Sequence, residues 1–258
     1  MTESSKSSAP IALITGGSRG LGRSMALHLA ERGTDIIVTY STAKQQAEQV
    51  VADIQGKGRQ AVALPLDVRD TQSYPAFVEA VRAQLVGSFG RSRLYALVNN
   101  AGTGLHAPFA ETTEAQFDEL VAIHFKSVFF LTQKLLPLIQ DGGRVLNVSS
   151  GLARFALPGY AAYASMKGGV EVLTRYLAKE LGPRRISVNV IAPGAIETDF
   201  GGGHVRDNRQ LNQIIAAQTA LGRVGLPDDI GAAVAVLLDP ANGWMTGQRI
   251  EVSGGQSI

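Results

Sequence analysis

The sequence runs IALITGGSRGLG from Ile11 to Gly22, and this stretch decides the fold. Apolar residues come first, a turn rich in glycine follows, and an apolar pattern of helical period begins within that turn. A short strand that leads through glycines into a helix is typical of the first unit of a parallel α/β sheet. The stretch therefore predicts a strand, a tight turn, and a helix that packs back onto the strand.

The same alternation of short apolar runs and longer helical segments continues along the chain. We predict strands at 11–15, 35–39, 60–64, 94–99, 144–149, 186–191 and 248–252. We predict helices at 21–32, 44–56, 74–87, 113–140, 160–181 and 228–238, and we expect Pro137 to end or kink the fourth. Because the strands are apolar on both faces, helices should cover both. The fold class is α/β, a doubly wound Rossmann-type parallel sheet of seven strands.

Length and composition suit one large domain. The chain has 258 residues, and no linker or shift in composition divides it. We expect residues 1–10 to form a flexible tail, 11–258 a single domain, and 194–225 the substrate-loop region. The polar start lacks the apolar core of a secretion signal, and no apolar run is long enough to cross a bilayer. We expect a cytoplasmic protein without a membrane segment.

Charge and residue usage exclude several function classes. The 24 basic and 22 acidic residues leave a net charge of +2, too weak a field to predict a nucleic-acid partner. The absence of cysteine excludes disulfides and thiol nucleophiles. His28, His106 and His204 lack metal-ligand spacing and are interpreted as packing or surface residues, so no metal site is predicted.

The glycine turn is a candidate phosphate-binding loop. Gly16 and Gly20 allow backbone conformations and close approaches that a Cβ would block, and Gly22 should let the helix lie close to the sheet. Free N–H groups at the helix start would then face a pyrophosphate. A turn without a ligand is the alternative, because the spacing departs from G-x-G-x-x-G. The expected contacts are Gly16, Ser18, Arg19, Gly20, Leu21 and Gly22.

The end of the second predicted strand bears on which dinucleotide binds. An NAD site usually places a carboxylate there, but Tyr40 and Ser41 occupy the region. The Arg19 guanidinium can pair with a 2′-phosphate, and Lys44 can add a second charge. We therefore predict NADP(H), with a solvated loop cation as the alternative role of Arg19.

Asp67 and Val68 follow the third predicted strand, and we expect both to contact the adenosine part of the dinucleotide. The Asp67 carboxylate can accept a hydrogen bond from the adenine amino group. A helix-capping role for Asp67 is the alternative.

Tyr163 and Lys167 are four residues apart and share one face of a predicted helix. A nearby ammonium stabilises a phenolate, so we expect a lowered pKa for Tyr163 and a role in proton transfer. A purely structural pair is the alternative. Ser150 lies at the carboxyl end of the fifth predicted strand, where ligands bind in open parallel sheets. Strand alternation directs its neighbour Ser149 elsewhere.

These motifs together resemble the short-chain dehydrogenase/reductase family, which includes bacterial 3-oxoacyl-[acyl-carrier-protein] reductases and carbonyl reductases. The resemblance runs from about Ile11 to Gly255. Four motifs fall in the family's order: Thr15–Gly22, Asn99–Gly102, Ser150 with Tyr163 and Lys167, and Pro193-Gly194.

The resemblance implies hydride transfer between a nicotinamide and a carbonyl or alcohol carbon. Tyr163 would protonate the carbonyl oxygen, Ser150 would polarise it, and Lys167 would lower the pKa of Tyr163 and bind the nicotinamide ribose. Further cofactor contacts are implied for Asn100, Ala101, Gly102, Pro193, Gly194, Ile196 and Thr198. The family is usually tetrameric, which implies a homotetramer with the helices at 113–140 and 160–181 in one interface.

His124 is a departure from the family pattern. Many members carry an asparagine at the equivalent helix position, where it holds a water that leads to the lysine. We hypothesise that His124 replaces that asparagine and that, because imidazole titrates near ~6.5, it brings a pH dependence. A histidine that only fills space is the alternative.

The region after Gly194 is a candidate substrate lid. Gly201–Gly203 can act as a hinge, and Phe200 with the segment 152–160 offers apolar walls. We therefore expect a small-molecule ketone with hydrophobic flanks, reduced to an alcohol with NADPH. The alternatives are an NAD-dependent alcohol dehydrogenase of the same family and a catalytically silent dinucleotide-sensing protein.

Overall fold

A computed structural model describes residues 9–258, and its centre is a parallel sheet of seven strands. The strand order is β3-β2-β1-β4-β5-β6-β7, so the chain winds outward from β1 in one direction and then, after β3, in the other. The strands are β1 (Ile11–Ile14), β2 (Asp35–Tyr40), β3 (Ala61–Pro65), β4 (Leu94–Asn99), β5 (Ile139–Val148), β6 (Ser187–Pro193) and β7 (Arg249–Val252). The predicted fold class is confirmed, while the predicted tail lies almost wholly outside the described residues.

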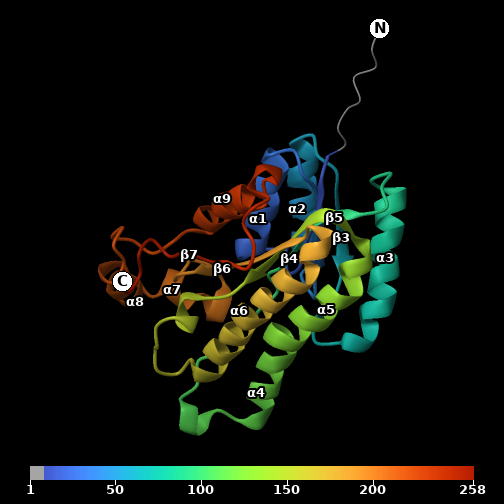
Figure 1. Cartoon of the computed structure of the whole chain (residues 1–258). Coiled ribbons are helices and arrows are strands. Elements are labelled where there is room, and N and C mark those ends of the chain that lie inside the picture. Colours follow the sequence, from blue (N-terminus) through green and yellow to red (C-terminus); the bar gives the residue numbers. More distant parts are fainter. Residues whose placement is uncertain (1–8) are drawn as a thin grey trace.

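Helices cover both faces of the sheet, as the doubly apolar strands predict (Figure 1). One face carries α1 (Gly20–Glu31), α2 (Lys44–Gly56) and α9 (Pro227–Leu237). The other carries α3 (Tyr74–Gly87), α5 (Ser127–Leu135) and α6 (Ala161–Leu181). Within β1, Ala12 and Ile14 pack on the first face, and Ile11 and Leu13 on the second. Burial on both faces therefore explains why β1 lacks polar alternation.

The fourth predicted helix differs from the prediction in two ways. It divides into α4 (Glu114–Val121), a π-helical turn (Ala122–Lys126) and α5. It also ends earlier than residue 140, because Pro137 lies in a 3-10 turn (Leu136–Leu138) and β5 begins at Ile139. Pro137 thus ends the helix as expected. The π turn was not predicted, since no residue type marks such a local change of backbone hydrogen bonding.

The chain leaves the sheet after β6 and returns before α9. The Ala195 carbonyl accepts from Gly225 N at 3.0 Å, and Glu197 N donates to the Gly225 carbonyl at 2.9 Å, so these contacts close the base of the excursion. It contains α7 (His204–Asp207) and α8 (Arg209–Ala217), which Figure 1 shows beside β6 and β7. Among residues 9–258, no helix combines the length and apolar character needed to cross a membrane.

Candidate active site

The predicted site residues come together at the carboxyl edge of the sheet. The glycine turn follows β1, the segment Asn100–Gly102 follows β4, Ser150 follows β5, and Gly194 follows β6. Parallel strands end at the same edge, and the strand order places β1, β4, β5 and β6 side by side there. The topology therefore gathers four loops that are far apart in the sequence.

The glycine turn is held by the segment that follows β4. The Asn100 side-chain amide donates to the carbonyls of Thr15 at 2.8 Å and Gly16 at 3.1 Å, and Thr15 Oγ1 accepts from the backbone N–H of Asn100 and Ala101. A Cβ on Gly16, whose φ is +65°, would lie 3.0 Å from Ala101 Cα. Asn100 thus clamps the turn, a more specific role than the implied lining of a cofactor.

Two glycines of the turn have different neighbours from those expected. A Cβ on Gly22 would lie 2.2 Å from the Gly16 carbonyl oxygen, so Gly22 lets the helix start close to the turn, and not to the sheet. Gly17 is the residue that packs on the sheet, because its Cβ would lie 2.6 Å from the Val38 side chain.

The start of α1 fits the phosphates of a dinucleotide. Arg19 occupies the N-cap position without a capping side chain, and the first turn holds no acidic residue. The first N–H groups of a helix have no intrahelical acceptor, and the helix dipole favours an anion there. A phosphate at this turn would accept from these donors, and its binding by Gly16 to Gly22 stays a prediction.

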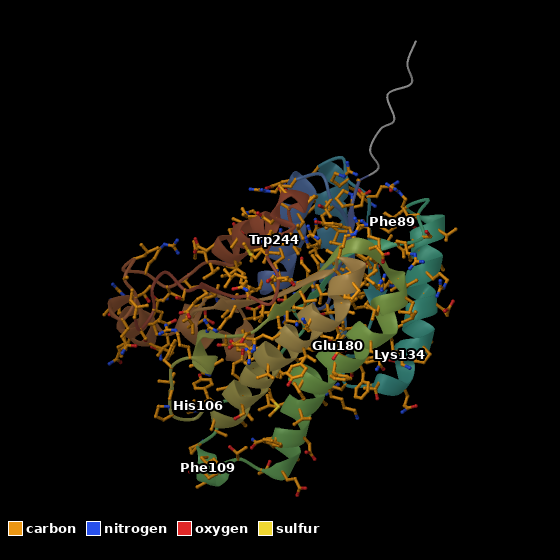
Figure 2. The ribbon with its side chains drawn as sticks, viewed as in Figure 1. Phe89, His106, Phe109, Lys134, Glu180 and Trp244 are labelled. Atoms are coloured by element: carbon orange, nitrogen blue, oxygen red, sulfur yellow. The ribbon has the colours of Figure 1, made fainter. Side chains whose placement is uncertain are left out.

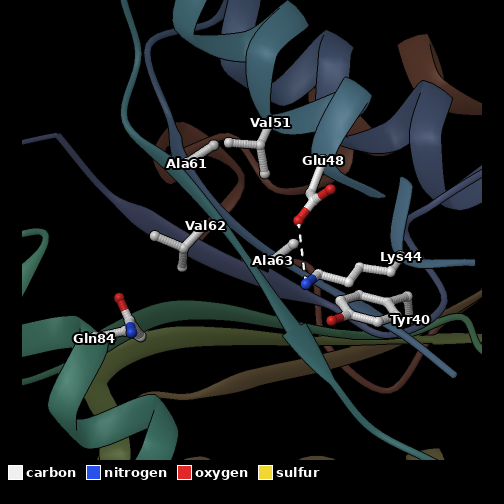
Figure 3. A pocket seen from close by; sticks show the side chains of 8 residues that line it. All are labelled: Tyr40, Lys44, Glu48, Val51, Ala61, Val62, Ala63 and Gln84. Atoms are coloured by element: carbon white, nitrogen blue, oxygen red, sulfur yellow. Dashed lines mark ion pairs between the residues drawn. The ribbon is translucent and has the colours of Figure 1, made fainter. Parts of the chain in front are cut away.

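The region expected to bind the adenosine part of the cofactor has basic side chains. No carboxylate stands at the end of β2. Tyr40 is the last residue of β2, and Ser41 and Arg19 are exposed. Lys44, the first residue of α2, lies 3.7 Å from Glu48. Figure 3 shows the Lys44 side chain beside the Tyr40 ring, with its ammonium turned toward Glu48. A cavity of about 360 Å3 lies beside them along β3, and its lining does not include Ser150, Tyr163 or Lys167.

Asp67 is already engaged by a neighbour. Its Oδ1 accepts from Arg69 N at 3.0 Å, and its Oδ2 accepts from the Arg69 guanidinium at 2.7 Å. These contacts lower the pKa of Asp67. Helix capping belongs instead to Asp70, whose carboxylate accepts from Gln72 N.

Tyr163, Lys167 and Ser150 form one buried cluster. Tyr163 and Lys167 lie on α6 and are 6% and 5% exposed, and the Lys167 Nζ atom is 5.5 Å from the centroid of the Tyr163 ring. Lys167 Nζ donates to the Val148 carbonyl at 2.8 Å, which ties α6 to the end of β5. Ser150 is close to the Tyr163 phenol, since its side chain is among the groups that shift the pKa of that phenol. The three residues that the sequence singled out are therefore adjacent.

The pKa of Tyr163 does not fall as expected. Burial raises its pKa, and the nearby Ser150 side chain opposes this rise only in part. Burial also lowers the pKa of Lys167 to about 8. The expectation fails because the ammonium lies over the tyrosine ring and is bound to a carbonyl, while both groups are cut off from water. The phenol accordingly keeps its proton at neutral pH.

His124 lies in the π turn and faces the cluster. Its ring is 1% exposed and packs edge-on against the Tyr163 ring, with 5.1 Å between centroids. The Nε2 atom is 2.8 Å from the Thr103 carbonyl oxygen, so Nε2 carries the proton and donates it. Nδ1 is buried and has no hydrogen-bond partner among residues 9–258.

The pKa of His124 lies below the range in which we expected the residue to make activity depend on pH. Burial, followed by repulsion from Lys167, lowers its pKa to about 3. The imidazole is therefore neutral over the working range of pH, with Nδ1 as an acceptor. A π turn often marks a functional position, and here it places this acceptor beside Tyr163.

The loop after β6 is supported by a residue that the sequence reasoning missed. Gln256 is buried, and its Oε1 accepts from Ala195 N at 2.9 Å. A Cβ on Gly194 would lie 2.8 Å from the same oxygen. Thr198 is buried as well, and its Oγ1 accepts from Phe200 N at 3.2 Å. No motif marks Gln256, because only the fold brings the chain end to this loop.

Phe200 is a second aromatic neighbour of Tyr163, and a separate ring contact forms at Tyr160. Phe200 is exposed and its ring centroid is 5.8 Å from that of Tyr163. His106 packs edge-on against Tyr160 at 5.1 Å. Figure 2 shows His106 and Phe109 on the segment that joins β4 to α4, with Phe109 farther out. His106 is exposed and packs on Tyr160, in agreement with its interpretation as a packing or surface residue.

Comparison with known proteins places this geometry in a family. A family model described as Enoyl-(Acyl carrier protein) reductase matches residues 16–257. A curated relative, 3-oxoacyl-[acyl-carrier-protein] reductase FabG of Staphylococcus aureus (strain Mu50), is 38% identical over 246 residues, covering 95% of this chain and 96% of the relative. The chain belongs to the short-chain dehydrogenase/reductase family. It is accordingly an oxidoreductase, as the sequence motifs predict.

Two further relatives of this short-chain dehydrogenase/reductase are named for reductase activity. The hydroxynaphthalene reductase-like protein Arp2 of Metarhizium brunneum (strain ARSEF 3297) is 37% identical over 257 residues, covering 95% of this chain and 94% of the relative. The angucycline C-6 ketoreductase LanV, solved with bound NADP, is 33% identical in sequence. Its structure matches with a TM-score of 0.91, and the match covers 96% of this chain and 95% of LanV. These relatives support carbonyl reduction with a nicotinamide dinucleotide. Among residues 9–258, no three His, Cys, Asp or Glu side chains converge as metal ligands.

Proposed function

We propose that the protein reduces a ketone to an alcohol with NADPH, and that Tyr163 is the general acid. The observation that carries this proposal is the buried Tyr163 phenol, close to Ser150 and beside Lys167, at the sheet edge where the glycine turn lies. A positioned proton donor of this kind contributes about a hundred- to ten-thousand-fold to a rate.

The bound dinucleotide would supply a hydride to the carbonyl carbon. Ser150 and Tyr163 would both donate hydrogen bonds to the substrate oxygen, and the Tyr163 proton would pass to that oxygen as it becomes an alkoxide. The raised pKa of Tyr163 keeps the phenol protonated, which favours reduction over oxidation near neutral pH. Lys167 would hold its charge below about pH 8 and stabilise the phenolate that remains.

His124 is proposed as a positioning residue beside Tyr163. Its proton is committed to the Thr103 carbonyl, so the Nδ1 lone pair is available to a water molecule or hydroxyl donor. An asparagine in this position would offer an oxygen acceptor of similar reach. This supports the hypothesis that His124 replaces the family asparagine, without a change of charge.

NADPH is proposed over NADH from the charges at the adenosine end. Arg19 and Lys44 are exposed cations near the end of β2, and Tyr40 and Ser41 take the place of a carboxylate that would repel a phosphate. Arg19 has no ion-pair partner within residues 9–258, so its guanidinium is free to pair with a 2′-phosphate. The relative LanV was solved with NADP.

The proposed substrate is an aromatic ketone. The Phe200 ring lies beside that of Tyr163, the rings of His106 and Tyr160 pack on each other just before Tyr163 in the chain, and a flat ring system can stack on or against such rings. The names of the relatives Arp2 and LanV point to hydroxynaphthalene and angucycline chemistry, which is aromatic as well. The proposed location remains the cytoplasm.

The proposed assembly is the homotetramer that is usual in this family. Phe117 on α4, Phe129 on α5 and Tyr176 on α6 are exposed at 42%, 41% and 65%. Large apolar side chains on neighbouring helices are typical of surfaces that subunits cover.

The test is reduction of α-tetralone, a bicyclic aromatic ketone, with NADPH or NADH. Tyr163→Phe should lower kcat at least a thousandfold and Ser150→Ala at least tenfold, with cofactor binding retained. Arg19→Ala should raise the KM for NADPH at least tenfold and leave that for NADH unchanged. Full activity of Tyr163→Phe would refute the mechanism, and an unaltered preference in Arg19→Ala would refute the cofactor assignment. The saturated ketone α-decalone is the control for aromatic preference.

A further inference from the structure

The two serines at the end of β5 face different partners. Ser150 Oγ accepts from Leu152 N at 3.2 Å and lies close to Tyr163. Ser149 is 2% exposed, and its hydroxyl donates to Glu171 Oε1 at 2.7 Å. The proposed mechanism uses only Ser150. Ser149 therefore has a strong buried contact that the chemistry leaves unexplained.

Glu171 connects this serine to the helix that carries the catalytic pair. It lies on α6 one turn beyond Lys167, and its side chain is 13% exposed. Its Oε1 also accepts from Arg249 Nε on β7 at 2.8 Å. A carboxylate so enclosed needs a cation close by, because an unpaired buried charge is costly.

Arg249 links Glu171 back to Ser150, the residue at the start of the loop after β5. Its Nη1 donates to Glu251 Oε2 at 2.7 Å, and its Nη2 is 3.4 Å from the Ser150 carbonyl oxygen. Arg249 and Glu171 therefore hold two consecutive residues of the strand end, Ser149 by its hydroxyl and Ser150 by its carbonyl. The planar guanidinium fixes the directions of these bonds, which an ammonium would not do.

We propose that Glu171 and Arg249 form a positioning pair that sets the placement of the Ser150 hydroxyl relative to Tyr163. This inference rests on the proposed roles of Ser150 and Tyr163. Lys167 Nζ donates to the Val148 carbonyl and Glu171 accepts from Ser149, so α6 holds the strand end just before Ser150 through Lys167 and Glu171. Arg249 holds it from β7. Small shifts of a reacting group lower rates steeply, up to about a hundredfold for ~1 Å.

The opposite end of β5 offers a matched control. Arg184 pairs with Asp141 at 2.8 Å and donates to the carbonyls of Leu136 and Ile139. This pair also joins an arginine, an acid and backbone carbonyls around one end of the same strand. It lies far along β5 from Ser150, so its loss should affect stability alone.

The experiment compares Arg249→Gln and Glu171→Gln with Arg184→Gln in the full chain, using NADPH and α-tetralone. We expect each of the first two to lower kcat about ten- to a hundredfold while the KM for NADPH changes less than twofold. The double variant should be no worse than the poorer single one, because both act through one contact. Arg249→Lys should recover only part of kcat. Arg184→Gln should keep the wild-type kcat, whatever its Tm.

Ser149→Ala covers the case in which a charged variant does not fold. It removes one bond to Glu171 and should lower kcat at least threefold at an unchanged KM for NADPH. A kcat within twofold of wild type in Arg249→Gln, or in Ser149→Ala if the charged variants do not fold, would overturn the inference. An equal loss in Arg184→Gln would overturn it too. If Ser150→Ala were fully active, the proposed function itself would fail, which is a different result.

Discussion

Two buried cations lie toward opposite edges of the sheet in similar surroundings. Lys167, near the carboxyl edge, and Arg144, level with the first residue of β6, are each 5% exposed. Each lies 5.5 Å from the centroid of a tyrosine ring, Tyr163 for the lysine and Tyr95 for the arginine. Each donates to backbone carbonyls in place of a carboxylate. The same arrangement, a buried cation beside a tyrosine ring and bonded to backbone carbonyl oxygen, thus occurs near both edges of the sheet.

The two cations differ in whether they can lose a proton. Lys167 donates to one carbonyl, and burial lowers its pKa to about 8, so it can change charge near neutral pH. Arg144 donates to the carbonyls of Gly142, Gly143 and Pro240, and a guanidinium does not lose its proton in a protein. Burial therefore prepares Lys167 for chemistry, whereas it makes Arg144 a cross-link between β5 and the loop after α9.

The largest effect that this comparison predicts is on activity in Lys167→Met. Removal of the ammonium should lower kcat about a hundred- to ten-thousand-fold, because the phenolate left after proton transfer loses its nearby charge. The Tm should change less than in Arg144→Met, because only one carbonyl, that of Val148, loses its donor while the cost of burying the charge disappears. Steady-state kinetics and thermal unfolding measure the two. A loss below tenfold would remove the distinction between the two cations.

The second prediction concerns stability in Arg144→Met. Three carbonyls lose their donor, and the free energy of unfolding should fall by about 3 kcal/mol. The kcat of the folded protein should stay within twofold of wild type, because Arg144 does not contact the catalytic cluster. Urea unfolding and kinetics on the same preparation test this. A large loss of kcat at full stability would show that both edges serve the chemistry.

The smallest effect is the acid sensitivity due to His124. The pKa of this residue is about 3 in the folded protein against a usual 6.5, so the unfolded chain binds a proton that the folded one does not. Stability should therefore fall as the pH drops below 6.5, by about 2 kcal/mol from pH 7 to pH 5. His124→Asn should remove this slope.

Urea unfolding of His124→Asn at several pH values measures the slope directly. His106→Asn is the control, because that ring is exposed in the folded protein and gains no burial penalty. An unchanged slope in His124→Asn would mean that the imidazole is hydrated in the folded state.

Much of the fold was predictable because local patterns and burial agree. The doubly apolar Ile11–Ile14 is buried on both faces, and the segment 44–56 is the helix α2 with the predicted bounds. The division of the fourth helix was not predictable. The π turn is a local change of backbone hydrogen bonding that no residue type marks, while Pro137 marks the end by a covalent constraint that is visible in the sequence.

The sequence by itself determined the α/β architecture and pointed to Ser150, Tyr163 and Lys167, because strand ends and helical spacing are local properties. Only the tertiary structure decided the protonation of these groups and the partners that hold them. Burial, which raises the pKa of Tyr163 and lowers that of His124, depends on every element packed around them. The bond from Glu171 to Arg249 joins residues 78 apart, a separation over which no local pattern extends.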